Sequence, residues 1–599
     1  LWDSYSSIDD YIEKCKANKY TFGVPKVCPK ELENERSLNY QFIQSYDLSD
    51  DDIEELIKPT MDEIKEVLGG DWRKTILFLR GSGLNEKNVI SSEDDVAKAI
   101  MIDRHMLNDT YVRNMIYQNI KNRIDEAKIG VLKVHGNYSI ASGDPYALCQ
   151  SIFGLEVTGL LKRGEIYNRY WSARGADKLV CFRAPMTTHE NIRAVHPANR
   201  DDVNYWFRYM KTCTVFNAWG TEMNSLNGMD FDGDLVMLTD NPVLVRRHRP
   251  MPALMCIQRK AAKRISSEND FIESNIASFG NDIGRTTNWI TSMFEVRSAF
   301  SPESKEYKEL TYRIRCGQLY QQNAIDKAKG IICNPMPKSW YDIHVVNKFD
   351  DDSKKDFYRS IVADKKPYFM RYIYPSLMKQ YNTYISNTNR NALREFQVTV
   401  PEMMSAPYES LTDRQREFLR YYGYRMPVGL NNCVMNRICR RFEEEFDGII
   451  KKSKPEIQFD YTILKSGVEY SMSRYYSIRK LYEDYNRQLR NLAIFSKYER
   501  VDGTDLKIEI DQLNYEFRKE CTKVCPNEET LCDIILDLCY SKSSTKKFAW
   551  EMCGKTIIHN LLERNSHKIS FPELSESGDI YYCGKAFSEH EIEIPDDSD

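Results

Sequence analysis

Three aspartates at alternate positions, followed at once by an apolar run, constrain this chain more than any other stretch. Asp230, Asp232 and Asp234 precede Leu235–Leu238, which reads as a buried strand. Alternate side chains of an extended segment share a face, and Gly233 permits a turn that a residue with a Cβ would resist. Carboxylates this close repel one another unless a cation lies among them. We therefore predict a site for Mg²⁺, which prefers hard oxygen ligands, at the end of a strand.

Two other readings of this motif need to be weighed. A solvated acidic turn is common, but three acids beside a buried strand are costly without a ligand. A calcium loop of the helix-loop-helix type also begins with D-x-D and needs Gly at its sixth position and Glu at its twelfth. Counted from Asp230, those positions hold Leu235 and Asn241, so the calcium reading fails.

Composition sets the outer limits. The 599 residues suggest about four domains, and the net charge of −4 means that any contact with nucleic acid must be a local patch. No apolar window is long enough to span a membrane, and the start, Leu1-Trp-Asp, lacks the features of a signal peptide. We read that start as a cut point within something longer. The 16 scattered cysteines fit reduced thiols in a cytosol-like compartment.

Residues 1–128 read as mostly helical. Ser49 is a candidate N-cap for a helix with apolar residues at helical spacing from Ile53 to Leu68. Pro59 lies inside this pattern, so we expect a kink or two short helices.

The period changes after Gly130. Val131–Val134 alternates, His135-Gly136-Asn137 is typical of a turn, and a second strand is expected from Tyr138. Further short strands are expected at residues 179–182 and 213–216. Short strands with glycine turns indicate a small β-barrel over residues 129–258.

Several motifs in this region resemble one family. Arg183-Ala-Pro185, Thr214–Gly220 and the Asp230–Asp234 element are similar to the second double-psi β-barrel of two-barrel RNA polymerases. Asn323-Ala-Ile-Asp-Lys327-Ala-Lys329-Gly330 resembles a segment of the cell-encoded RNA-dependent branch. Gly143-Asp-Pro-Tyr and Gly159–Glu165 look most like the polymerases of crAss-like phages. The resemblance covers about residues 130–335.

The resemblance implies roles for particular side chains. The three aspartates would hold the Mg²⁺ that activates the RNA 3′ hydroxyl, and a second Mg²⁺ would arrive with the nucleoside triphosphate. Arg183 would contact the incoming ribose, or else form a salt bridge at the barrel rim. Asn227 would support the loop or a ligand, or else serve as a turn residue. Lys327 and Lys329 would face substrate or product, or else be exposed lysines.

The chain also departs from the family. The polymerases of this family need a first barrel whose basic residues neutralise the triphosphate charge, and residues 1–128 contain nothing similar. We expect that half of the active site in an upstream segment or a separate subunit. The segment from Asn241 to Ser267 contains basic residues and no acids. This basic stripe is a candidate for contact with a phosphate backbone, or else a solvated basic face. Its members are Arg246, Arg247, Arg249, Arg259, Lys260, Lys263 and Arg264.

The predicted fold class is α+β and mostly helical. The barrel is followed by a bridge-like long helix, about residues 269–300, within a region 259–345 that includes the lysine-rich segment. A helical C-terminal region is expected over residues 346–588, and a disordered acidic tail over 589–599.

The predicted function is template-directed RNA synthesis from NTPs, by an enzyme in the cytoplasm of a bacterial host or packaged in the virion. The phage-like motifs favour a DNA template over RNA. An RNA-directed polymerase and a non-catalytic scaffold that binds nucleic acid are the alternatives.

Overall fold

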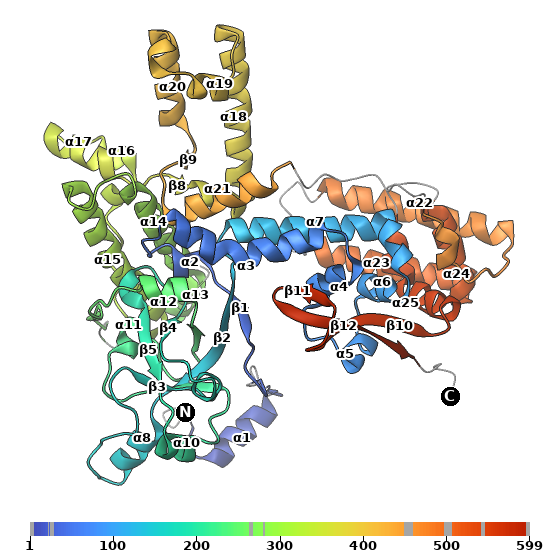
Figure 1. Cartoon of the computed structure of the whole chain (residues 1–599), viewed down its shortest axis with the longest axis horizontal. Coiled ribbons are helices and arrows are strands. Elements are labelled where there is room, and N and C mark those ends of the chain that lie inside the picture. The colour runs from blue at the N-terminus through green and yellow to red at the C-terminus, as the bar shows by residue number, and fades with distance from the viewer. Residues whose placement is uncertain are drawn as a thin grey trace. The chain divides into compact units, whose positions relative to one another are not determined.

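The computed structural model of the chain is shown in Figure 1. It describes residues 5–594 apart from 22, 24–28, 261, 263–266, 279–281, 449–458, 496–505 and 541–545. Two compact units are present, one of Leu1–Leu56 with Ile129–Ile438 and one of Ile57–Lys128 with Cys439–Asp599. This division differs from the predicted one, because most of the region 1–128 belongs to the same unit as the end of the chain.

The first unit contains a closed barrel. Its strands are β2 (Lys133–Ser142), β3 (Glu165–Tyr167), β4 (Leu179–Phe182), β5 (Arg193–Pro197), β6 (Cys213–Phe216) and β7 (Leu235–Thr239). They follow the order β2-β6-β3-β5-β4-β7, and a further pairing of β2 with β7 closes the ring. The β2–β6 and β3–β5 pairs are parallel and the others antiparallel. Trp171, Cys181, Phe216 and Leu238 lie in its buried core. The predicted barrel is confirmed.

One predicted turn is wrong. β2 runs without interruption through His135-Gly136-Asn137, and Gly136 pairs with Thr239 of β7. A Cβ on Gly136 would lie 2.8 Å from the carbonyl oxygen of Leu238. Gly136 is therefore needed because two strands approach each other closely at this position. Close approach and tight turns both favour glycine, so the sequence alone does not distinguish them.

The segment before the barrel joins it through β1 (Glu35–Ser37), which pairs antiparallel with β2. α2 (Tyr40–Ile43) and α3 (Asp50–Leu68) follow. The predicted cap is confirmed, since Ser49 Oγ accepts from the Asp52 amide and the Asp52 carboxylate accepts from the Ser49 amide. The predicted break at Pro59 is wrong, because α3 continues through it. Buried apolar side chains before and after the proline hold the helix together and offset its one missing hydrogen bond.

Smaller helices connect the barrel strands. They are α8 (Pro145–Ile152), α9 (Arg169–Ala173), η2 (His189–Asn191), α10 (Asp201–Trp206) and α11 (Glu222–Ser225). After β7 come α12 (Pro242–Arg247), α13 (Glu268–Ser278), α14 (Asp282–Arg297), α15 (Lys305–Ile325) and η3 (Asp326–Lys329). The predicted long helix over 269–300 corresponds to α13 and α14, and Gly280 between them lies outside the described residues. α14 and α15 share a core that includes Ile290, Phe294 and Ile314.

The rest of the first unit is largely helical, as predicted. It comprises η4 (Lys338–Trp340), α16 (Ile343–Val346), α17 (Asp352–Ile361), η5 (Tyr368–Tyr372), α18 (Pro375–Phe396), α19 (Val400–Ser405), η6 (Tyr408–Ser410), α20 (Asp413–Arg425) and the first residues of α21 (Val434–Phe446). Two short strands, β8 (Lys366–Pro367) and β9 (Val428–Gly429), pair in parallel.

The second unit combines helices from two separate stretches of the chain with a small sheet. Its helices are α4 (Trp72–Arg80), α5 (Glu86–Ile90), α6 (Asp95–Ile102), η1 (Arg104–Asn108), α7 (Thr110–Lys128), η7 (Tyr461–Leu464), α22 (Met472–Phe495), α23 (Leu506–Val524), α24 (Glu528–Tyr540) and α25 (Lys546–Arg564). The strands β10 (Lys568–Leu574), β11 (Ile580–Tyr582) and β12 (Lys585–Glu593) form an antiparallel sheet.

This sheet corrects the predicted acidic tail. Residues 589–593 belong to β12 and pair with β10, so a tail starting at residue 589 is wrong for these positions. Glu591 is exposed and pairs with Lys568, while Ile592 is buried. The acids lie mainly on the solvent side of a strand, and their number in the sequence hid this alternation. Residues 595–599 lie outside the described part.

Among the described helices, none combines the length and apolar composition that crossing a bilayer requires.

Candidate metal centre

The barrel brings the aspartate motif and the Arg183 motif to one place. β4 pairs antiparallel with β7, and Phe182, the last residue of β4, lies opposite Met237. The residue after β4 and the residues before β7 therefore meet at the same end of the barrel. Asp230, Asp232 and Asp234 each offer one carboxylate oxygen there, and these three atoms lie within 4.8 Å of one another.

The backbone of the loop is held in a defined shape. The amide of Asp230 donates to Asp234 Oδ2 at 2.9 Å, and Ala141 of β2 donates to the Asp234 carbonyl at 2.8 Å. Gly233 has a φ of 119°, which strongly favours glycine. Phe231 packs against Gly143, where a Cβ would lie 2.8 Å from its ring. These contacts hold the loop in one shape.

Arg183 links the end of β4 to this loop. Its Nη2 donates to the Asp234 carboxylate, with an ion-pair distance of 2.9 Å, and Nη1 donates to the Asn227 carbonyl at 2.9 Å. A weaker bond of 3.4 Å reaches the Leu226 carbonyl. The side chain of Arg183 is 12% exposed, so these bonds form in a partly desolvated setting. The rim salt bridge, one of the two predicted roles, is present, and the ribose contact stays a prediction.

Asn227 ties the loop to the helices that follow the barrel. It is buried, with a φ of 55°, which asparagine tolerates better than most residues. Its Nδ2 donates to the Pro185 carbonyl at 2.7 Å and to Gln321 Oε1 of α15 at 2.9 Å. Gln321 in turn donates to Thr287 of α14 at 2.6 Å. Asn227 is thus both a turn residue and a support of the loop.

Gln321 was missed by sequence reasoning. It is fully buried on α15, 94 positions from the asparagine that it contacts. The only sequence signal is a run of glutamines, Gln318, Gln321 and Gln322, at helical spacing just before the lysine-rich segment. Such spacing alone does not distinguish a buried polar contact from a solvated face.

The donor set fits a divalent cation. Three carboxylates from five consecutive residues supply hard oxygen ligands, and their arrangement brings one oxygen of each within reach of a single ion. Arg183 compensates the negative charge of Asp234 alone, and it approaches that carboxylate from the side of β4. Carboxylates, water and substrate phosphates are the usual ligands of protein-bound Mg²⁺. The residues present therefore suit this metal.

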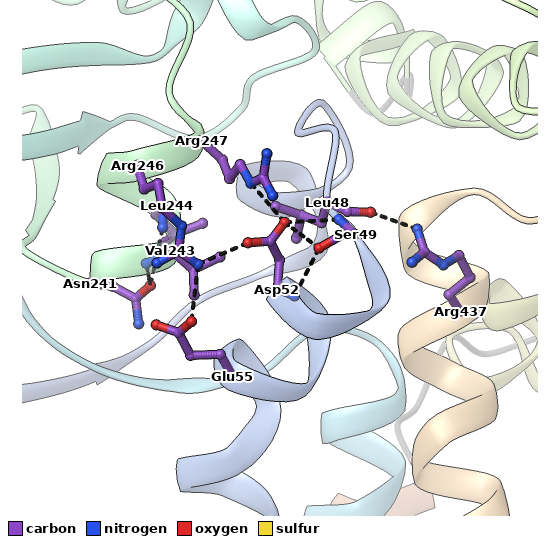
Figure 2. A network of polar contacts seen from close by, with 10 residues as sticks. All are labelled: Leu48, Ser49, Asp52, Glu55, Asn241, Val243, Leu244, Arg246, Arg247 and Arg437. Carbon is purple, nitrogen blue, oxygen red and sulfur yellow. Dashed lines mark hydrogen bonds and ion pairs between the residues drawn. The ribbon is translucent and has the colours of Figure 1, made fainter.

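Two arginines of the predicted basic stripe have protein partners instead. Figure 2 shows Arg246 and Arg247 of α12 converging on Asp52 of α3, at 2.8 and 2.7 Å. Arg246 also reaches Glu55 at 3.0 Å. Burial alone would raise the pKa of the Asp52 carboxyl, but the hydrogen bonds from the two arginines and from Ser49 outweigh it and hold that pKa well below its ordinary value. These ion pairs clamp α12 to α3, and phosphate contact by the two half-exposed arginines stays a prediction.

The other basic residues are placed as follows. Arg249, Arg259 and Lys260 are exposed, and Lys260 forms an isolated bridge with Ile331. Lys263 and Arg264 lie outside the described residues. Lys327 pairs with Asp282 at 3.1 Å, with both side chains about half exposed at 46% and 49%. The side chain of Lys329 lies outside the described part.

A buried histidine was also missed from the sequence. His189 follows the Arg183 motif, and its Nε2 accepts from the Arg249 amide at 3.0 Å. Its ring stacks on His248 with centroids 5.5 Å apart. Burial, followed by the nearby positive charge of Arg249, lowers the pKa of His189 to about 3. The side chain is therefore neutral at physiological pH.

Comparison with known proteins gives one significant curated relative. No protein-family model matches the chain. The DNA-directed RNA polymerase YonO of Bacillus phage SPbeta is 26% identical over 302 residues, which cover 49% of this chain and 34% of that protein. The match thus spans about a third of the relative's length. Among solved structures, the RNA dependent RNA polymerase QDE-1 from Thielavia terrestris covers 90% of this chain and 57% of its own, with 12% identity and a TM-score of 0.40.

Proposed function

We propose that this chain carries the metal-binding half of the active site of a template-directed RNA polymerase. The observation that carries the proposal is the placement of Asp230, Asp232 and Asp234 at the end of a barrel, with one oxygen of each within 4.8 Å of the others. The sequence likeness to a phage DNA-directed RNA polymerase supports the same reaction. A scaffold that only binds nucleic acid would not need three carboxylates held at ligand distance, so catalysis is favoured over that alternative.

The roles of the residues follow from their contacts. The three carboxylates would hold Mg²⁺, and such an ion, with a second one brought by the nucleotide, would supply activation of the 3′ hydroxyl and charge stabilisation of the pyrophosphate. Arg183 fixes Asp234 and the carbonyls before it, and we assign it a further contact with the ribose of the incoming nucleotide. Asn227 and Gln321 fix the start of the loop from the side of α15.

The substrates are NTPs, and we propose DNA as the template, because the significant relative is DNA-directed. RNA is the alternative template, supported by the segment Asn323–Gly330. We assign the chain to the crAss-like phage branch of these enzymes and place its action in the cytoplasm of a bacterial host. Exposed Arg249, Arg259 and Lys260 are candidates for phosphate contact, together with Lys327 and Lys329 near the product.

The site needs a partner. Triphosphate charge requires cations opposite the aspartates, and we propose that a first barrel, in an upstream segment of the same protein or in a separate subunit, supplies them. The three proposed metal ligands themselves do not come from the first barrel.

The test is a primer-extension assay with this chain and the part that supplies the first barrel. NTPs and Mg²⁺ are provided with either a single-stranded DNA or an RNA template. Asp232→Asn should lower nucleotide addition by roughly a hundred- to a thousandfold, since a metal ligand contributes several kcal/mol. Asp240→Asn is the matched control, because Asp240 lies just beyond β7 and pairs with His135. Equal rates for Asp232→Asn and the unaltered enzyme would refute the proposal.

A further inference from the structure

The hairpin formed by α18, α19 and α20 presents side chains that packing does not explain. α18 has 22 residues, and only Ala392 among them is buried, while α20 buries none. The two long helices lie antiparallel and side by side (Figure 1), joined by ring contacts between Tyr384 and Tyr422 and between Phe396 and Phe418. The outward face of α18 is therefore available for another task.

That face has an unusual charge pattern. No Asp or Glu occurs from Pro375 to Arg394, although 88 of the 599 residues in the chain are acidic. Exposed residues at helical spacing form one stripe that is polar or basic throughout, and it consists of Lys379, Thr383, Ser386, Asn387, Arg390 and Arg394. From Pro375 to Arg394, a polyanion along this stripe would meet no carboxylate of α18 itself.

The helix also forgoes stability to display these side chains. Seven of the ten residues from Asn382 to Asn391 are Asn, Ser or Thr. Each is less favourable in a helix than Ala, by up to about 0.7 kcal/mol. A helix selected only to be solvated would gain from Glu–Lys pairs four residues apart, and α18 has none in this stretch because it has no acid there. Short donors and acceptors interspersed with cations suit a sugar-phosphate backbone.

α20 adds aromatic groups to the same hairpin. Tyr421 and Tyr424 are 57% and 70% exposed, which is high for large aromatic side chains. The guanidinium of Arg425 lies 5.4 Å from the ring centroid of Tyr421, and Arg420 is exposed as well. Aromatic rings stack on unpaired bases, and arginines beside them neutralise the adjoining phosphates.

We propose that the α18–α20 hairpin grips nucleic acid, with the α18 stripe on the phosphate backbone and the tyrosines of α20 on unpaired bases. The contact is independent of sequence and sensitive to salt. The inference rests on the proposed function only for the identity of the strand, which would be template or product. Binding itself is measurable without catalysis.

The test measures binding of the full chain to fluorescein-labelled single-stranded DNA and to an RNA–DNA hybrid by fluorescence anisotropy at several KCl concentrations. The variant combines Lys379→Gln, Arg390→Gln and Arg394→Gln. Three lost phosphate contacts should reduce the slope of log K against log salt by about 2 to 3, at 0.7–0.9 per phosphate. The substituted side chains are exposed, so circular dichroism should show an unchanged fold.

Two control variants make the result specific. The pair Arg390→Lys and Arg394→Lys should keep the salt slope, because lysine also contacts phosphate. Removal of three exposed charges from α22, by Arg474→Gln, Lys480→Gln and Arg490→Gln, should leave the slope unchanged.

Asp232→Asn should bind normally while losing nucleotide addition, which separates failure of this inference from failure of the proposed function. Three outcomes would overturn the inference. They are no binding by the unaltered chain, an unchanged slope in the hairpin variant, and an altered oligomeric state of that variant in light scattering with binding intact. The last would assign the hairpin to contact between copies of the chain.

Discussion

Replacing Asp52 with Asn should destabilise the first unit, although the residue is far in sequence from the barrel. Its carboxylate is 3% exposed and accepts bonds from Arg246, Arg247 and Ser49 (Figure 2). An amide of the same size keeps the space filled. It removes the negative charge between two guanidinium groups and turns an amide NH₂ toward at least one of them.

The magnitude follows from burial. Breaking a buried ion pair by removing one partner costs about 3–5 kcal/mol. The two arginine side chains are 48% and 43% exposed, so water solvates them once the carboxylate is gone. We therefore expect a loss of about 2–3 kcal/mol. For a unit as large as this one, an unfolding entropy of about 2.1 cal/mol/K per residue means that each kcal/mol lowers Tm by only about 1.3 °C, so the first thermal transition should fall by about 3–4 °C.

Glu55→Gln is a matched control on the same helix. Glu55 contacts the same Arg246 at 3.0 Å, but its side chain is 46% exposed. An exposed pair contributes at most about 1 kcal/mol, so this variant should melt within about 1 °C of the unaltered chain. Circular dichroism or scanning fluorimetry gives both values. Equal melting of Asp52→Asn and the unaltered chain, or an equal fall in the Glu55 variant, would refute the argument from burial.

The pH dependence provides a second check on Asp52. Its pKa is held below the ordinary value in the folded chain, so its stabilising effect is complete above the unfolded pKa of about 3.9. The effect is lost as the pH falls through the folded pKa. The difference in Tm between the Asn variant and the unaltered chain should therefore be constant from pH 7 to about 5 and shrink only below about 4.

Two further predictions concern the barrel. Arg183→Lys leaves a single ammonium group in contact with Asp234 and two carbonyls, so nucleotide addition should fall by about 10- to 100-fold and the preference for ribonucleotides should weaken. Primer extension with competing deoxynucleotides measures both effects. The control Arg200→Lys alters the ion pair with Glu165 and should change neither. His189 has a pKa of about 3 in the folded chain and binds a proton more readily when the chain is unfolded, so stability should fall as the pH drops below about 6.5. The variant His189→Gln should reduce that loss by up to about 2 kcal/mol at pH 5. Thermal melts in which the variant and the unaltered chain respond identically to acid would contradict this prediction.

The strands and the metal loop could be predicted because their signals are local. Alternation of side chains and the apolar run after Asp234 identify β7, and three acids on one face predict that their oxygens meet. The same local rules failed where one residue type serves two purposes. Gly136 reads as a turn, yet it allows two strands to approach, and a proline within α3 reads as a break where flanking apolar contacts keep the helix whole.

The ion pairs could not be predicted, because a charge in a sequence does not reveal what it faces. Arg246 and Arg247 belong to a stretch without acids, which favours a phosphate-binding surface, but the fold places them against an aspartate 194 positions before Arg246. Asp52 in turn reads as one of several acids on a solvated helix. Only the pairing of α12 with the start of α3 distinguishes this buried carboxylate from its exposed neighbours Asp50 and Asp51.

The metal loop shows the same division between local and tertiary information. The motif determines which atoms can bind a cation, but three distant segments hold them in position: β2 through the Ala141 amide, β4 through Arg183, and α15 through Gln321. Asn227, at a positive φ, depends on the last of these for one of its two side-chain bonds. The helices after the barrel are therefore part of the site's architecture, because a barrel without α15 would keep the three aspartates but lose a support of the loop that presents them.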